Sequence, residues 1–287
     1  MRMTATLETV TDFPVPARKI IRFSWQTGPW FDVFQRQVLL IQDDLARARA
    51  GDRLVAYLSC PVSPRGGGHP GTNVAVAGHT ARRLAADLGE RFHVLNPAAY
   101  QLESAEGRTT LARHAADLGL DLAELLAATS PKGGDYMRMW TRVLVEDDGE
   151  QLGARFDAMH LLGPSDVRDF FLRGAPGPLI GAIEEYFARR YALDPDFRAD
   201  FEAVPPTDPQ WEARRTAFVR YYAIRAGAAY SLGSHDEWNI AVRLNAARRA
   251  STVLGPGAGQ QIALVFDGRQ VPPGSAETET SPGYEVV

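Results

Sequence analysis

The pattern of residues 52–97 restricts most strongly which folds this chain can adopt. The run "DRLVAYLS" (52–59) is typical of a buried strand, and "RFHVLNP" (91–97) has a similar pattern. Between them lie a glycine-rich loop and a segment with helical spacing, for which Thr72 or Asn73 is the expected N-cap. A strand, a helix and a second strand at this spacing predict a βαβ unit with parallel strands.

The same alternation continues along the chain. Residues 154–163 match a third parallel strand, residues 177–192 match its crossover helix, and residues 260–268 match a late strand. We therefore expect an α/β fold with a Rossmann-like, mostly parallel sheet, flanking helices and a C-terminal helical extension. Ligands of such folds bind at the carboxyl ends of the strands. Further patterns indicate a strand at 19–25 and helices at 30–50, 108–118, 121–128 and 136–147.

Changes in composition divide the chain into four parts. We expect a flexible N-terminus (1–18), an α/β core (19–192), a helical extension packed on the core (193–255) and a peripheral tail (256–287). The extension has an aromatic stripe at helical spacing, which must be buried on the chain's own sheet or against a second copy in a homodimer. The stripe consists of Trp211, Phe218, Tyr221 and Tyr222.

Charge and cysteine content argue against several classes of protein. The 287 residues include 31 Lys and Arg against 35 Asp and Glu, a net charge of −4, so no nucleic-acid partner is expected. No apolar run approaches the roughly 18 residues of a membrane span. One cysteine and no apolar signal-peptide core predict a soluble protein of the reducing cytoplasm. The six histidines lack metal-ligand spacing, and neither a metal nor another cofactor is expected.

Reactive side chains occur where the predicted strands end. Tyr57, Ser59 and Cys60 end the first strand of the βαβ unit, and Glu184 and Glu185 lie in the first turns of the helix at 177–192. A carboxylate near a helix N-terminus is kept ionised by the helix dipole, which suits a nucleophile. The alternative is ordinary surface charge. Cys60 could instead act as a thiolate nucleophile with a nearby histidine, or simply fill the core.

The glycine-rich loop "SPRGGGHPG" is a candidate phosphate site. The guanidinium of Arg65 and the backbone N–H groups of Gly66, Gly67 and Gly68 could together hold a phosphate. The alternative is a mobile surface loop that binds nothing.

Two further polar segments are candidates for ligand contacts. Ser165 and Asp166 follow the third strand directly, and the stretch "SHDEWN" contains Asp236, Glu237 and Asn239. If the aromatic helix packs on the core, the second stretch would be carried to the same crevice. Both segments can equally serve as helix N-termini.

Short motifs in the chain resemble the nucleoside 2-deoxyribosyltransferase-like superfamily. "YLSCP" (57–61) resembles its Tyr-Leu/Ile-Ala-Gly-Pro strand end, and "DYMRMWTRVLVEDDGEQLGARFDAMHLL" (135–162) resembles its helix followed by an Asp-Ala strand. "GAIEEYFA" (181–188) is similar to its glycine-x-x-x-glutamate helix start. The resemblance covers roughly residues 53–192.

The resemblance implies a reaction in which a glutamate attacks the anomeric carbon of a nucleoside or nucleotide and the base departs. Glu185 or Glu184 would be the nucleophile, and Tyr57 would orient it. Asp135 and Asp157 are candidates for the acid that protonates the leaving base. Asp157 could equally cap the start of its strand.

The chain also departs from the superfamily pattern. It has Cys60 where the family often has glycine, and it lacks the aspartate that precedes the glutamate. The expected activity is that of an N-ribosyl hydrolase or (deoxy)ribosyltransferase whose core binds a small nucleoside or nucleotide. Two alternatives stay open, namely a non-catalytic nucleotide-binding or sensing module and a Cys60-dependent transferase.

Overall fold

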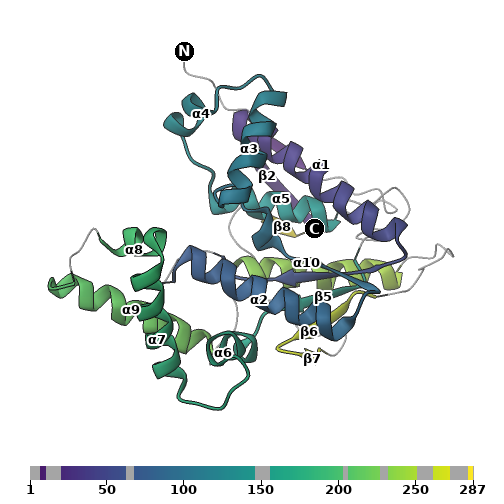
Figure 1. The fold of residues 1–287 in the computed structure, drawn as a ribbon. Coiled ribbons are helices and arrows are strands. Elements are labelled where there is room, and N and C mark those ends of the chain that lie inside the picture. Colours follow the sequence, from purple (N-terminus) through teal and green to yellow (C-terminus); the bar gives the residue numbers. More distant parts are fainter. Residues whose placement is uncertain are drawn as a thin grey trace.

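A five-stranded, mostly parallel sheet lies at the centre of the fold (Figure 1). Its strand order is β4-β3-β5-β6-β7, in which only β7 runs antiparallel to its neighbour. The predicted α/β class, the βαβ unit and the late strand are thereby confirmed. The strands are β3 (Leu54–Ser59), β4 (Phe92–Leu95), β5 (Ala158–Leu161), β6 (Ala263–Phe266) and β7 (Arg269–Gln270).

The structure is a computed structural model. It describes residues 7–10, 21–62, 68–145, 156–202, 206–226, 232–250, 261–271 and 284–286. Its first helices are α1 (Pro29–Ala50), α2 (Pro70–Leu88), a short 3-10 helix η1 (Pro97–Tyr100), α3 (Ala105–Asp117), α4 (Leu122–Ala128) and α5 (Gly133–Val145). They are followed by α6 (Pro164–Leu172), α7 (Leu179–Leu193), α8 (Pro195–Glu202), α9 (Pro209–Arg225) and α10 (Leu232–Ala250).

Helices cover both faces of the main sheet, because successive side chains of a strand point to opposite sides. Val55 and Tyr57 face a core that also contains residues of α1, α5 and α10. Leu58 faces a second core, which contains residues of α2, α6 and the helices after α6. Contacts of α1 with β3, of α10 with β5 and of α2 with β4 fix these helices to the sheet. The strands therefore lie between two helical layers.

Helix α2 begins at a histidine cap. His69 Nδ1 accepts a hydrogen bond of 3.0 Å from the backbone N–H of Thr72, and its Nε2 lies 2.8 Å from Asp200 Oδ2. The prediction of Thr72 or Asn73 as N-cap is therefore wrong, because both lie inside the first turn.

Helices α7, α8 and α9 form a group beside α2 (Figure 1). α7 packs on α6, α8 and α9, and its buried side chains are Ile183 and Phe187. This differs from the prediction that residues 177–192 pack back on the sheet as a crossover helix. The reason is that α10, which precedes β6, packs on β5 instead.

An aromatic core holds this group of helices together. The ring of Phe187 lies 5.1 Å from that of Phe218 and 5.6 Å from that of Trp211, measured between centroids. The expected burial of the aromatic stripe on α9 is confirmed, since Trp211, Phe218, Tyr221 and Tyr222 are all buried within the chain.

A second, antiparallel sheet joins distant parts of the chain. Its order is β1-β2-β8, with β1 (Leu7–Val10), β2 (Ile21–Gln26) and β8 (Tyr284–Val286). The strand expected at 19–25 is thus present, but it lies outside the main sheet. β1 falls in the segment expected to be flexible, and β6, β7 and β8 fall in the expected peripheral tail. Both terminal segments therefore contribute strands to a sheet.

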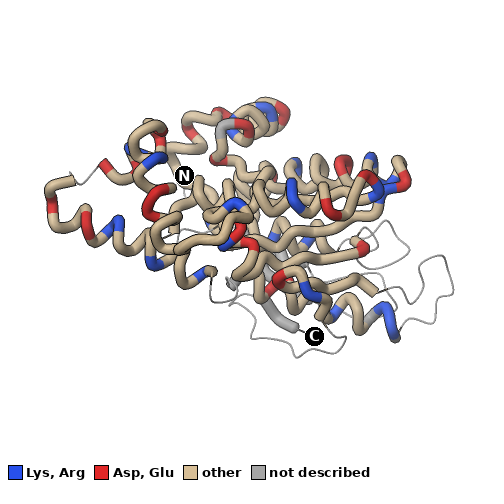
Figure 2. The backbone as a smooth tube through the Cα atoms, turned by 60° about the horizontal axis from the view of Figure 1, so that its bottom comes forward, with Lys and Arg blue, Asp and Glu red and all other residues tan. Residues whose placement is uncertain are grey.

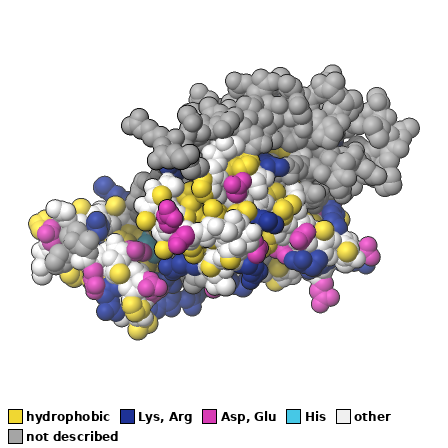
Figure 3. All heavy atoms as spheres, turned by 90° about the horizontal axis from the view of Figure 1, so that it is seen from above, with side chains coloured by type: hydrophobic (Ala, Val, Ile, Leu, Met, Phe, Trp, Pro, Cys, Tyr) yellow, Lys and Arg dark blue, Asp and Glu magenta, His cyan; other side chains and the backbone are white. Residues whose placement is uncertain are grey.

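Charges of both signs are spread over the described residues. Lysine and arginine are interspersed with aspartate and glutamate along the backbone (Figure 2). Figure 3 shows hydrophobic and charged side chains mixed on the coloured part of the face seen from above. Among the described helices, none combines the length and the apolar character needed to cross a membrane.

Candidate functional site

A buried carboxylate lies above the carboxyl end of β3. The hydroxyl of Tyr57 donates a hydrogen bond of 2.6 Å to Glu237 Oε1, and the hydroxyl of Ser59 donates a short one to Oε2. Tyr57 and Ser59 are two residues apart on β3, so both side chains stand on the face covered by α10. All three residues are buried, and Glu237 retains only 5% of its exposure. Each carboxylate oxygen therefore has its own fixed donor.

Burial sets the protonation of this site. Burial raises the pKa of Glu237, and the nearby charge of Asp236 raises it further, whereas the hydrogen bonds from Ser59 and Tyr57 lower it. The resulting pKa is about 7. Burial, and then the charge of Glu237, raise the pKa of Tyr57 well above its usual value, so the phenol stays protonated and acts as a donor. Near neutral pH Glu237 can therefore exchange a proton, while Tyr57 cannot.

Aromatic rings enclose the phenol. The ring of Tyr57 meets those of Trp140 on α5 and Phe156 edge to face, at centroid distances of 5.7 and 5.8 Å. Such apolar walls exclude water and strengthen the electrostatic interactions within. They explain why the carboxyl group of Glu237 is hard to ionise.

Glu184 and Glu185 lie elsewhere. Both are exposed on α7, and Glu184 Oε1 lies 3.8 Å from Arg215 Nη2 on α9. The expected contact between Tyr57 and this pair is therefore absent, and Tyr57 orients Glu237 instead. The physical reason is that α7 packs on other helices and not on the sheet face that Tyr57 occupies.

Cys60 does not have the surroundings of a reactive thiolate. Its Sγ lies 3.9 Å from Asn96 Oδ1, and burial, followed by the charge of Glu237, raises the pKa of the thiol. An activated cysteine needs a lowered pKa. The histidines that follow it, His69 and His79, pair with aspartates.

Asp157 lies at the opposite edge of the sheet from Glu237. Its Oδ2 accepts a hydrogen bond of 2.7 Å from the backbone N–H of Val55 and lies 2.8 Å from Arg49 Nη1. Asp157 therefore caps the start of β3, the neighbour of the strand that Asp157 precedes, so the alternative interpretation as a strand cap holds for that neighbouring strand.

Asp135 is committed to the start of α5. It accepts hydrogen bonds of 3.0 Å from Trp25 Nε1 and 2.9 Å from the backbone N–H of Lys132. The second bond satisfies an N–H group that the helix leaves unpaired. Both contacts use the carboxyl oxygens of Asp135 as acceptors, which ties the side chain to Trp25 and to the start of α5.

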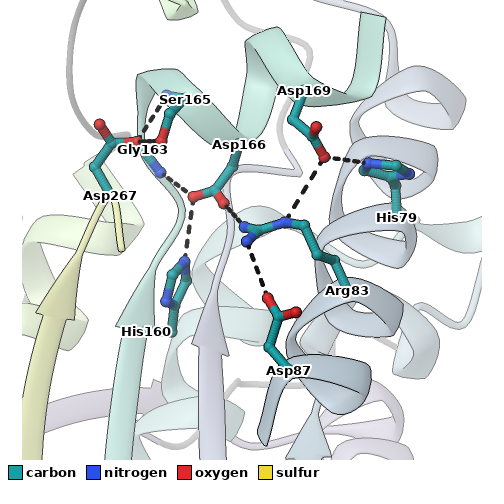
Figure 4. A network of polar contacts seen from close by, with 9 residues as sticks. All are labelled: His79, Arg83, Asp87, His160, Gly163, Ser165, Asp166, Asp169 and Asp267. Atoms are coloured by element: carbon teal, nitrogen blue, oxygen red, sulfur yellow. Dashed lines mark hydrogen bonds and ion pairs between the residues drawn. The ribbon is translucent and has the colours of Figure 1, made fainter. Parts of the chain in front are cut away.

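Asp166 is the centre of a separate polar network (Figure 4). It accepts a hydrogen bond of 2.8 Å from the backbone N–H of Gly163, lies 3.2 Å from His160 Nε2 and pairs with Arg83 of α2. Burial opposes its ionisation, but His160, Gly163 and Arg83 outweigh burial and lower the pKa of Asp166. Since both carboxylate oxygens are occupied, Asp166 fastens α2 and α6 to the end of β5.

The same network continues on both sides of Asp166. Arg83 also approaches Asp169, which lies 2.7 Å from His79 Nε2. Ser165 is held by the β6–β7 turn, because Asp267 Oδ1 accepts a hydrogen bond of 2.7 Å from its backbone N–H (Figure 4). Ser165 therefore contacts Asp267, a residue that the sequence patterns did not single out.

The remaining candidates lie on α10 and in the glycine-rich loop. Asp236 and Asn239 are both buried, and the charge of Asp236 acts on Glu237. Arg65, Gly66 and Gly67 lie outside the described residues. Gly68 is described, and a Cβ there would lie 2.6 Å from Cζ of Tyr221, so its backbone rests on that ring.

No family model, no curated protein and no solved structure matches the chain. In the part of the chain that the structure describes, no group of three or more His, Cys, Asp or Glu side chains could hold a metal ion.

Proposed function

We propose that the protein cleaves or transfers at the N-glycosidic bond of a nucleotide or nucleoside, with Glu237 as the nucleophile. The observation that carries this proposal is the buried carboxylate of Glu237, held by Tyr57 and Ser59 at the carboxyl end of β3. A carboxylate can attack the anomeric carbon and form a sugar ester while the C–N bond to the base breaks, and the base then leaves with the bonding electron pair and takes its proton from water. Water or a second acceptor would then release the sugar.

The site supports Glu237 better than Glu184 or Glu185 in this role. Its two oxygens are fixed by two donors, and a perturbed pKa in a buried position at a strand end is typical of functional carboxylates. The resemblance implies a glutamate oriented by a strand-end tyrosine, and in this proposal α10 supplies it. The sheet would then serve as a Rossmann-like core and the C-terminal helices as the extension that completes the site.

Release of free base tests the proposal. The protein is incubated with a panel of nucleosides, nucleotides and NAD, and free base is measured by chromatography. Glu237→Gln keeps the shape of the side chain but removes the nucleophile, so turnover should fall by roughly a hundredfold or more. The exposed residues supply controls, since Glu184→Gln and Glu185→Gln should release base as the wild type does. Full activity in Glu237→Gln would overturn the assignment, and a loss confined to Glu185→Gln would point back to α7.

A non-catalytic nucleotide-binding or sensing module is the second candidate. Glu237 is 5% exposed, and both of its oxygens already have hydrogen-bond donors, so a substrate must displace part of this arrangement to react. A sensor needs no such displacement. Calorimetric binding of a nucleotide without release of base from any compound of the panel would support this candidate.

A further inference from the structure

A small pocket opens at the carboxyl edge of the main sheet. Pro61 lines it just beyond the end of β3, and Leu162 lines it just beyond β5. These strands are parallel neighbours, and α/β sheets bind ligands at such an edge. The pocket is partly open, and its enclosed part has room for about one water-sized group.

Arg225 brings a positive charge to this pocket. It lies at the end of α9, with its guanidinium carbon 5.1 Å from the centroid of the Tyr221 ring. Within the described ranges no carboxylate forms an ion pair with Arg225. A guanidinium without a carboxylate partner is available to bind a phosphate or carboxylate group.

Tyr221 adds a second donor. Its side chain lines the same pocket and is 7% exposed, and its buried hydroxyl has no hydrogen-bond partner among the described residues. Native structures rarely leave a buried hydroxyl unpaired, because its desolvation is costly. The backbone of Gly68 rests on the ring and fixes its position. An acceptor oxygen supplied by a ligand would satisfy this hydroxyl.

The first turn of α2 favours the same sign of ligand charge. Asn73 and Val76 of this helix line the pocket, and the first turn of α2 contains no acidic residue. The positive end of the helix dipole is therefore not offset by a carboxylate of its own turn. The helix dipole therefore adds to the attraction of an anion by the side chains of Arg225 and Tyr221, and it would not define a site without them.

We propose that this pocket is an anion subsite that holds the phosphate group of a nucleotide through Arg225 and Tyr221. This inference rests on the proposed function, because the nucleoside part of the ligand is taken from it. Pro61 is two residues from Ser59, a span of at most about 7 Å along the chain. Glu237 lies on the α10 face of the sheet and the pocket lies on the opposite face, so a ligand that reached both would have to pass across the carboxyl end of β3.

Binding of three probes tests the subsite. Inorganic phosphate, adenosine 5′-monophosphate and adenosine are titrated into the full-length protein by calorimetry, with phosphorus NMR for weak phosphate binding. We expect phosphate to bind, and the nucleotide to bind more tightly than the nucleoside by roughly tenfold to a hundredfold. Absence of phosphate binding, or equal affinities for nucleotide and nucleoside, would overturn the proposal.

Variants identify the donors. Arg225→Met should remove the advantage of the nucleotide and leave adenosine binding unchanged, and Tyr221→Phe should reduce it about two- to tenfold. Arg220→Met is the matched control, because Arg220 is an exposed arginine on the same helix. An equal loss in both arginine variants would show a general charge effect and overturn the subsite.

The outcomes also separate the two proposals. Phosphate binding that depends on Arg225, without release of base from any compound, would retain the subsite and reject the glycosidic reaction. Release of base together with nucleotide binding that does not depend on Arg225 would retain the reaction and reject the subsite.

Discussion

At Glu237, opposing effects decide the state of one carboxyl group. Tyr57 and Ser59 favour the ionised form through their hydrogen bonds, whereas burial and Asp236 favour the protonated form. Burial is the largest of these effects, because Glu237 lies in a core lined by the rings around Tyr57. The balance leaves a group that both accepts and releases a proton near neutral pH.

Glu237→Gln should flatten the dependence of stability on pH. The pKa of Glu237 is about 7 in the folded protein, above its ordinary value of 4.5, so between these values the folded state binds more protons than the unfolded chain. The free energy of unfolding therefore falls as the pH rises through this range, by ~3 kcal/mol from this residue. Urea unfolding at a series of pH values measures this slope in the wild type and in Glu237→Gln.

Glu185→Gln is the control for this measurement. Glu185 is exposed on α7, so its substitution should leave the slope of the wild type unchanged. Parallel slopes in the wild type and in Glu237→Gln would contradict the assignment of a raised pKa to Glu237.

The sequence indicates the members of the site but not their contact. Tyr57 is recognisable from its place at a strand end, and Glu237 from a polar stretch at a helix start. Their hydrogen bond joins positions 180 residues apart, and no local pattern reports such a contact. Glu184 and Glu185 have the more familiar local pattern, yet tertiary packing leaves them in solvent.

At the scale of elements, periodic patterns identify most helices and strands, and tertiary contacts decide how they end and pack. The start of α2 is an example. Thr72 and Asn73 are good cap residues by type, but the ring of His69 takes the cap position because Asp200 of α8 holds its other nitrogen. The aspartate comes from a helix far along the chain, so the pattern around residue 70 cannot reveal it.

Gly163→Ala should destabilise the junction of β5, α6 and the β6–β7 turn. A Cβ at Gly163 would lie 2.4 Å from Cβ of Asp267, which is too close for both backbone segments to keep their positions. The shift would also disturb the bond from Gly163 to Asp166 and the contact of Ser165 with Asp267. We expect a loss of about 1–3 kcal/mol in the free energy of unfolding, measured with urea.

Gly133→Ala is the matched substitution. A Cβ at Gly133, the first residue of α5, meets no atom within 4 Å. Its stability should equal or slightly exceed that of the wild type, since alanine favours helix. If Gly163→Ala were as stable as Gly133→Ala, the close approach of Asp267 would not constrain the junction.

At the scale of the whole molecule, C-terminal elements complete the main sheet and the core whose first strands lie in the middle of the sequence. β6 comes from the last tenth of the sequence and lies between β5 and β7 in the main sheet. α10 adds Trp238, Ile240 and Leu244 to the core that Tyr57 faces. Composition suggests a boundary at residue 193. Strand β6 and helix α10 lie beyond this boundary, yet they pack on β5 and on the core around Tyr57, and composition does not record such contacts.

Two truncations test this dependence. A chain that ends at Ala226 lacks α10, β6, β7 and β8, so it exposes the apolar face of β5 and removes the residues that α10 adds to the core around Tyr57. We expect it to lose the cooperative thermal transition, followed by circular dichroism. A chain that ends at Val271 keeps all five strands of the main sheet and, of the described elements, lacks β8, so it should retain a cooperative transition at a lower midpoint. A sharp, native-like transition in the shorter chain would show instead that β3, β4 and β5 form a stable core without the C-terminal elements.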